Sequence, residues 1–263
     1  MDRFYRAVVD TGHAVFALQG LRFRVTGVHN IPRTGPAVMV LNHTNYLDFM
    51  FGGFIADMAG RYVRFMCKEA IFRHPVGGPF MRAMQHIPVD REAGAESFLA
   101  SLRALKSGEI VGVFPEATIS RSFELKEFKS GAVRMAQASG APILPVVSWG
   151  GQRIWSKGKP KRLGRTKTPV AIRIGQPYIV PKDASIDEAN AELKRRMQEM
   201  LDIEQREYPQ LTGEDRQFLP RRLGGIAPTL EEATALDQRD SALRRELREK
   251  READAAAKKV LTR

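Results

Sequence analysis

Cysteine is nearly absent from this chain of 263 residues, which contains Cys67 alone. A single cysteine excludes an intramolecular disulfide and any zinc site built from several thiolates, and it fits a reducing compartment. Long apolar runs are also lacking, since the longest stretch that tolerates glycine lies between Asp48 and Asp57. We therefore expect no transmembrane helix. Asp2, Arg3 and Arg6 are followed by a polar interruption at residues 10–13, so we expect no signal peptide either.

Acidic residues are too few to balance the basic ones: 42 Lys and Arg face 30 Asp and Glu, giving a net charge of +12. A surface this basic favours anionic partners, namely nucleic acid, an anionic membrane or phosphorylated substrates. Nucleic acid is disfavoured because no groove-reading motif is present. The apolar content of 43% is enough for a sizeable core and excludes a fully disordered chain.

Residues 1–20 have the pattern of an amphipathic helix. Helical spacing brings these apolar side chains near one face: Phe4, Val8, Val15 and Leu18. Such a helix either packs on the rest of the domain or lies in a membrane interface. The sequence leaves both interpretations open.

Short apolar runs alternate with helical stretches over residues 21–180. The predicted strands are residues 21–28, 37–41, 63–67, 110–114, 143–147 and 170–174, and the predicted helices are 47–59, 93–106 and 131–139. This alternation predicts an α/β fold with a central, largely parallel sheet flanked by helices. Pro145 lies inside one predicted strand and indicates that this strand is short or at an edge.

The remainder of the chain is predicted to be helical. Residues 185–208 form one long, charged helix candidate, and glycine and proline then interrupt the pattern. Residues 231–259 are rich in Ala, Arg and Glu, which is typical of a solvated helix or a fraying tail. We therefore divide the chain into an N-terminal amphipathic helix at 1–20, an α/β domain at 21–210 and a charged helical or partly disordered tail at 211–263.

A histidine and an aspartate lie in residues 42–48, NHTNYLD, directly after the predicted strand 37–41. Reactive groups of α/β proteins lie at the carboxyl ends of parallel strands. If the turn folds back, Asp48 accepts a hydrogen bond from one ring nitrogen of His43 and leaves the other as a general base. Histidine suits this role because its unperturbed pKa is about 6.5. The alternative is a structural hydrogen bond, and no second histidine stands at metal-ligand spacing.

Two further polar segments follow apolar runs. Residues 116–122 combine Glu116, Thr118 and Arg121 with two serines, a set that can bind a polyol and a phosphate together. The alternative is a surface turn whose hydroxyls bond one another. Residues 68–91 begin at Lys68 and end at Arg91, and each of these either faces a phosphate or is a solvated charge.

Together these segments resemble the sequence blocks of the glycerolipid acyltransferases, whose best-known members are the PlsC-type 1-acyl-glycerol-3-phosphate (lysophosphatidate) acyltransferases. Residues 42–48 are similar to the family's NHxxxxD block, and residues 114–118, FPEAT, to its FPEGTRS block. Residues 68–91 resemble the second block, residues 143–147, ILPVV, the fourth, and residues 128–132, FKSGA, the downstream FKKGA stretch. Four blocks in order, over about residues 20–180, are far more specific than any one of them.

This resemblance implies an O-acyltransferase in which His43, oriented by Asp48, takes the proton of the acceptor hydroxyl. The oxygen attacks the thioester of acyl-CoA or acyl carrier protein, without an acyl-enzyme, a metal or another cofactor. The implied acceptor is 1-acyl-glycerol-3-phosphate and the product phosphatidate, for phospholipid biosynthesis. The implied acceptor-binding residues are Lys68, Arg91, Glu116, Thr118 and Arg121, and the implied acyl-donor-binding residues are Pro145 and Val146.

Two positions depart from the family pattern. Ala117 stands where the family usually has glycine, and Ile119 stands where it usually has the arginine thought to hold the acceptor's phosphate. Arg121 is a candidate substitute two residues on. The acceptor is therefore lysophosphatidate or, alternatively, another lysolipid or lipid hydroxyl. An alternative of another class is a catalytically silent lipid-binding protein, although such a protein has no chemical need for His43 and Asp48.

A basic stretch follows the fourth block. It has no acidic residue and contains Arg153, Lys157, Lys159, Lys161, Arg162, Arg165 and Lys167. Trp149 and Trp155 lie near its start, and interfacial tryptophan beside basic residues suits an anionic bilayer, at about 1 kcal/mol per basic residue. The alternative is a solvated basic loop. We expect a peripheral protein on the cytoplasmic face of the cell membrane, held by the N-terminal helix and this stretch.

Overall fold

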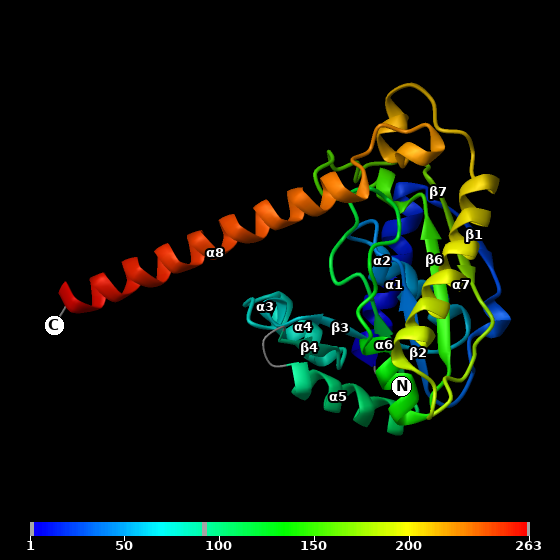
Figure 1. Ribbon diagram of the computed structural model, residues 1–263, viewed down its shortest axis with the longest axis horizontal. Coiled ribbons are helices and arrows are strands. Elements are labelled where there is room, and N and C mark those ends of the chain that lie inside the picture. The colour runs from blue at the N-terminus through cyan, green and yellow to red at the C-terminus, as the bar shows by residue number, and fades with distance from the viewer. Residues whose placement is uncertain (1–2, 91–93, 262–263) are drawn as a thin grey trace. The chain divides into compact units, whose positions relative to one another are not determined.

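Seven strands form the sheet in the computed structural model, which describes residues 3–90 and 94–261. They are β1 Arg22–Thr26, β2 Ala37–Leu41, β3 Val63–Lys68, β4 Ile87–Val89, β5 Ile110–Val113, β6 Ile143–Trp149 and β7 Pro169–Ile174. Their order across the sheet is β1-β7-β6-β2-β5-β3-β4. Figure 1 labels all of these strands except β5. All neighbours are parallel except β6 and β7. The predicted α/β fold with a largely parallel sheet is confirmed.

The chain divides into two compact units. The first comprises Met1–Ser120 and Leu125–Gln210, and the second comprises Arg121–Glu124 and Leu211–Arg263. The sheet belongs to the first unit, together with α1 Arg3–Gln19, α2 Asp48–Met58, α3 Glu69–Phe72, α4 Gly77–Ala83, α5 Gly94–Lys106, α6 Gly131–Ser139 and α7 Ile186–Glu207. None of the described helices has the length and hydropathy needed to cross a membrane.

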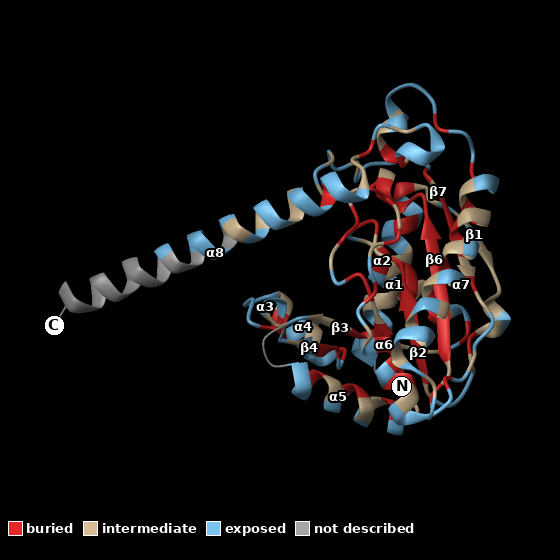
Figure 2. Ribbon diagram, in the orientation of Figure 1, coloured by how far each residue is buried: buried red, intermediate tan, exposed pale blue. Residues whose placement is uncertain are grey.

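Helices cover both faces of the sheet. Met39 and Leu41 of β2 share a buried core with Phe16 of α1 and Phe51 of α2. The intervening valines point to the opposite face, because side chains alternate along a strand. On that side α6 packs on β2 and β6, and α7 packs on β6 and β7. All of β2 is therefore buried (Figure 2), which explains why it is an unbroken apolar run.

The prediction that Pro145 marks a short or edge strand is wrong. β6 has seven residues and lies between β2 and β7. The Pro145 carbonyl accepts a hydrogen bond from Gly175 N at 2.8 Å. Because the nitrogen and the carbonyl of one strand residue point to the same side, the Pro145 nitrogen also faces Gly175, which lies beyond the end of β7. Pairing with β7 begins one residue later, at Val146. The proline therefore removes no bond from either ladder.

The N-terminal helix α1 packs on the first unit through one side. Tyr5 and Phe16 are buried, and the Tyr5 hydroxyl donates to Val63 O at 2.8 Å. Phe4 and Val15 are exposed apolar residues that directly precede the buried Tyr5 and Phe16. Consecutive side chains of a helix are rotated by about 100° around its axis, so the two exposed residues lie beside the buried side. Leu18 is 74% exposed. Part of the apolar face therefore remains open to solvent.

The second unit contains short 3-10 turns, at Gly213–Phe218 and Arg221–Leu223, and helix α8, Leu230–Leu261. α8 begins at a capping box: Glu232 N donates to Thr229 Oγ1 at 3.1 Å, and Thr229 N donates to Glu232 Oε2 at 2.9 Å.

Candidate active site

The loop between β2 and α2 folds back on itself, which is the condition for a contact between His43 and Asp48. Asp48, the first residue of α2, accepts hydrogen bonds at Oδ2 from Thr44 N, at 2.8 Å, and Asn45 N, at 2.9 Å. The Asn45 carboxamide in turn accepts from Leu47 N at 2.8 Å. Asn and Asp favour such turns because their short side chains reach neighbouring backbone N–H groups.

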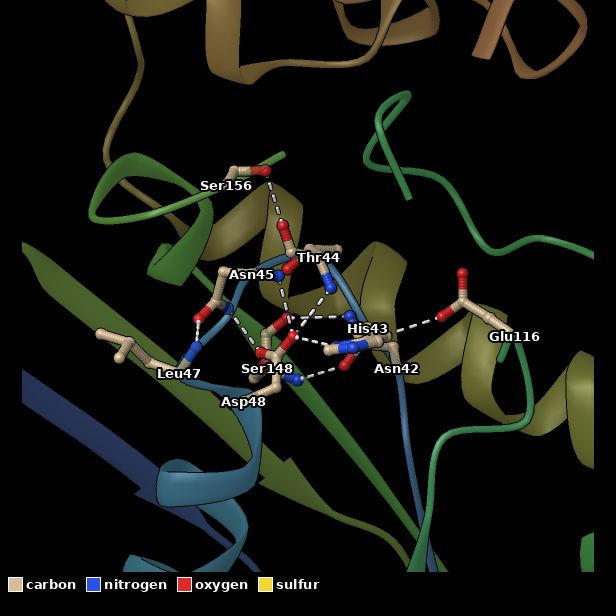
Figure 3. Close-up of polar contacts among 9 residues, drawn as sticks. All are labelled: Asn42, His43, Thr44, Asn45, Leu47, Asp48, Glu116, Ser148 and Ser156. Atoms are coloured by element: carbon tan, nitrogen blue, oxygen red, sulfur yellow. Dashed lines mark hydrogen bonds and ion pairs between the residues drawn. The ribbon is translucent and has the colours of Figure 1, made fainter. Parts of the chain in front are cut away.

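This fold of the loop brings His43 against Asp48 (Figure 3). His43 Nδ1 lies 3.1 Å from Asp48 Oδ2. An ionised carboxylate only accepts hydrogen bonds, so Nδ1 carries the proton and Nε2 carries the lone pair. The Asp48 side chain is fully buried, whereas that of His43 is 20% exposed. The geometry is that of an oriented imidazole whose outer nitrogen can take a proton.

Ser148 supports the pair from the neighbouring strand β6. Its hydroxyl donates to Asp48 Oδ1 at 2.8 Å. Its backbone N donates to Asn42 Oδ1 at 2.7 Å, and Asn42 Nδ2 donates to Ser148 O at 3.1 Å. The histidine loop is thereby fixed to the sheet. The sequence gives no signal for Ser148, because its contact with Asp48 spans 100 residues.

Phe114 and Glu116, which follow β5, enclose the other side of His43. The rings of Phe114 and His43 stack with centroids 4.2 Å apart. Glu116 Oε1 accepts from His43 N at 2.8 Å, and Oε2 accepts from Lys126 N at 3.1 Å. Burial raises the pKa of Glu116 to about 8, against the opposing effect of these two N–H donors. Glu116 therefore anchors the backbone on both sides of the site.

The other predicted acceptor-binding residues lie in different settings. Lys68 is exposed at the carboxyl end of β3, on the side of the sheet where the parallel strands β2 and β5 also have their carboxyl ends. Thr118 accepts at Oγ1 from Lys126 Nζ at 2.7 Å. Arg121 belongs to the second unit, where it pairs with Asp237, at 3.3 Å, and with Asp240. Arg91 lies outside the described residues.

An apolar cavity of about 590 Å³ lies between α1, α2 and α4. Phe49, which directly follows Asp48, and Phe65 are among its lining residues, and the Phe65 ring stacks on Phe114 with centroids 6.1 Å apart. His86 also lines the cavity, and burial together with Arg64 lowers its pKa to about 4, so that it stays uncharged. The cavity thus adjoins the His43 site through two phenylalanine rings.

The sequence did not locate this cavity, because its walls come from residues between Phe4 and His86 that are distant in the chain. Pro145 and Val146, the predicted donor-binding residues, are buried in β6 and are not among its lining residues.

The basic stretch contacts the histidine loop through one of the two tryptophans. Trp155 O accepts from Tyr46 N at 3.0 Å, the two rings lie 4.8 Å apart, and Lys161 Nζ lies 4.6 Å from the centre of the Trp155 ring. The prediction of Trp149 as an interfacial residue is wrong. It is 1% exposed, because it ends the interior strand β6 and packs against Tyr208.

The sequence contains one thiol, that of Cys67. Burial raises the pKa of the Cys67 thiol to about 12, which keeps it protonated and poorly nucleophilic. Within residues 3–90 and 94–261, no three His, Cys, Asp or Glu side chains gather as a metal site requires.

Known proteins share both the sequence and the fold. The sequence model of a family described as Acyltransferase matches residues 22–149. The 1-acyl-sn-glycerol-3-phosphate acyltransferase of Bacillus subtilis is 30% identical over 161 residues, 60% of this chain and 78% of that protein. The Borreliella burgdorferi protein of the same name is 32% identical over 132 residues, 49% of this chain and 52%, about half, of that protein. The crystal structure of the 1-acyl-sn-glycerophosphate acyltransferase PlsC from Thermotoga maritima has a TM-score of 0.64 at 22% identity, covering 78% of this chain and 81% of that one.

Proposed function

Because the chain belongs to the PlsC-type glycerolipid acyltransferase family and is an O-acyltransferase of that type, we propose that its acceptor is 1-acyl-glycerol-3-phosphate and its product phosphatidate. The observation that carries this proposal is the His43–Asp48 pair, at 3.1 Å, at the carboxyl end of β2. Relatives whose names specify this acceptor support the choice of substrate.

In the proposed reaction His43 Nε2 takes the proton of the acceptor hydroxyl as its oxygen attacks the thioester carbonyl carbon. The new C–O bond forms, the C–S bond breaks, and the thiolate leaves and takes up the proton that His43 holds. Asp48 stabilises the imidazolium formed in between. Proton transfer of this kind contributes about 10²- to 10⁴-fold to the rate. No metal or other cofactor is part of this proposal.

The apolar cavity is proposed to hold an acyl chain. Its volume of about 590 Å³ lies within the range of about 300–1,000 Å³ typical of small-molecule sites. Several of its lining side chains are also exposed, at 38% for Phe4, 40% for Phe49 and 64% for Val76. An acyl chain therefore has an apolar route from the surface into this cavity.

A second candidate function keeps the chemistry and changes the acceptor. Ile119, in place of the arginine expected from the family, is buried at 6% exposure and supplies no charge for a phosphate. This observation favours another lysolipid or a lipid hydroxyl.

Both candidates are tested by following free thiol release from acyl-CoA, and separately from acyl carrier protein, with a panel of lysolipid acceptors. The proposal expects lysophosphatidate to give the highest kcat/KM. If lysophosphatidate ranks last, the second candidate is favoured. If no lysolipid supports release above background with either donor, the acceptor is a lipid hydroxyl outside this panel or the chain is a silent lipid-binding protein.

We also propose that the protein binds the cytoplasmic face of an anionic membrane. The exposed apolar residues of α1 and the basic stretch around Trp155 support this proposal. The protein is expected to sediment with anionic vesicles and to be released by high salt. Leu18→Asp should weaken sedimentation, whereas Leu243→Asp, at an exposed leucine of α8, should not. Equal binding to neutral vesicles at every salt concentration would remove the electrostatic part of the proposal.

A further inference from the structure

The acceptor of the proposed function carries its phosphate ester on the carbon next to the one that bears the reacting hydroxyl. When that hydroxyl meets His43, the phosphate must therefore lie a few bonds away, and a cation is needed there to hold it. Ile119 is apolar and buried. The Arg121 guanidinium already pairs with Asp237 and Asp240. The cation that binds the phosphate is therefore expected to be another residue, in the first unit.

Lys126 is fixed to His43 by a shared carboxyl group. Glu116 accepts from His43 N through Oε1, at 2.8 Å, and from Lys126 N through Oε2, at 3.1 Å. A single side chain thus joins the two backbone segments and holds them at a fixed spacing. Glu116 is buried, which strengthens this link because water does not compete for its oxygens.

The ammonium of Lys126 points back toward the FPEAT segment rather than into bulk solvent. Its Nζ donates to Thr118 Oγ1 at 2.7 Å, and its charge lies near enough to lower the pKa of Glu116. Because the Thr118 oxygen accepts from Lys126, its own hydroxyl hydrogen is directed away from the ammonium. The two side chains together offer one charge and one further donor, which is the chemistry that a phosphate monoester binds.

We propose that Lys126, paired with Thr118, binds the acceptor's phosphate and takes over the role that the family's arginine has at the position of Ile119. The inference rests on the proposed function. It assigns the headgroup selectivity of the enzyme to a residue seven positions further along the chain than Ile119.

The test compares two acceptors in the same detergent micelles: 1-acyl-glycerol-3-phosphate and 1-acyl-glycerol, which lacks the phosphate. For Lys126→Met we expect the KM for the phosphorylated acceptor to rise about 10- to 100-fold, as for loss of a charged hydrogen bond. The KM for the acyl donor and the kcat/KM for 1-acyl-glycerol should not change. Lys126→Arg should restore most of the affinity.

The matched control is Lys129→Met. Lys129 is an exposed lysine on the same segment, and its contact with the site is made through its backbone, where Lys129 N donates to Pro115 O at 2.9 Å. We expect its kinetics to match those of the wild type. Thr118→Val provides a second variant if Lys126→Met does not fold, and it should show the same selective loss in smaller measure.

An unchanged KM for the phosphorylated acceptor in Lys126→Met, or an equal loss with both acceptors, would overturn the assignment. Failure of the proposed function has a different signature, since the wild type itself would then show no preference for the phosphorylated acceptor.

Discussion

Replacing Asp48 by asparagine separates the charge of this residue from its shape. The amide oxygen can take the place of only one carboxylate oxygen. At the Oδ2 position an amide NH₂ would face the N–H groups of Thr44 and Asn45, which cannot accept a hydrogen bond. At the Oδ1 position it faces the Ser148 hydroxyl, which can rotate and accept. We therefore expect the amide oxygen to remain at Oδ2, where His43 still donates to it.

The expected loss is then electrostatic. Two opposite unit charges about 4 Å apart interact by about 4 kcal/mol at an effective dielectric constant of about 20. If the imidazolium of the transition state loses this stabilisation, kcat falls about 10³-fold. The free energy of unfolding should fall by about 1–3 kcal/mol, because the Asn45 side-chain amide at 2.5 Å from Oδ1 loses its acceptor.

Thiol release at saturating donor and acceptor measures kcat, and urea denaturation measures the unfolding free energy. The matched control is Asp57→Asn, since Asp57 also lies on α2 and its Oδ2 lies 3.1 Å from His13 Nε2. That variant should keep kcat within about threefold, because no proton transfer is assigned to His13. A kcat of Asp48→Asn that also stays within threefold of the wild type would refute the reasoning.

Three further variants test other parts of the site. Ser148→Ala removes a hydrogen bond to a buried charge and should lower the unfolding free energy by about 1.5–3 kcal/mol in urea, and a loss below 0.5 kcal/mol would contradict the role given to this hydroxyl. Glu116 has a folded-state pKa of about 8 against an ordinary value of 4.5, so its contribution to stability is complete below about pH 4.5 and is lost as the pH rises through 8. From pH 5 to 8 the wild type should therefore lose about 1.4 kcal/mol per pH unit relative to Glu116→Gln, whereas parallel stability curves would exclude the raised pKa. Gly53→Leu should shift the preferred acyl chain to shorter lengths, because Gly53 lines the cavity and a Cβ there meets nothing within 4 Å; an unchanged chain-length profile would place the acyl chain elsewhere.

The sequence predicts those parts of the fold that leave a local pattern. Strands such as β2 and β5 are buried on both faces and therefore appear as apolar runs with clear ends. β4 was not predicted as a strand, because its three residues are too few to show a pattern and its position depends on pairing with β3. The interior position of Pro145 is not predictable for a related reason: whether its missing N–H removes a ladder hydrogen bond depends on where β7 ends, which no local pattern contains.

The same distinction applies to the site. His43 and Asp48 are only five residues apart, so the sequence suggests their contact on the condition that the intervening turn folds back, and the structure meets that condition. Ser148 and the lining of the acyl cavity come from distant segments, so their chemistry is visible only after folding. Trp149 is the opposite case: its residue type and its basic neighbours suit a membrane interface, but its position in the interior strand β6 buries it.

The proton-accepting role of His43 is tested most directly by thiol release with the His43→Ala variant, with lysophosphatidate and acyl-CoA both saturating. The matched control is His29→Ala, at an exposed histidine outside the loop. We predict that kcat falls at least about 10²-fold for His43→Ala and is unchanged for His29→Ala, while both variants keep the wild-type circular dichroism spectrum. A folded His43→Ala protein that releases thiol at the wild-type rate would contradict the mechanism.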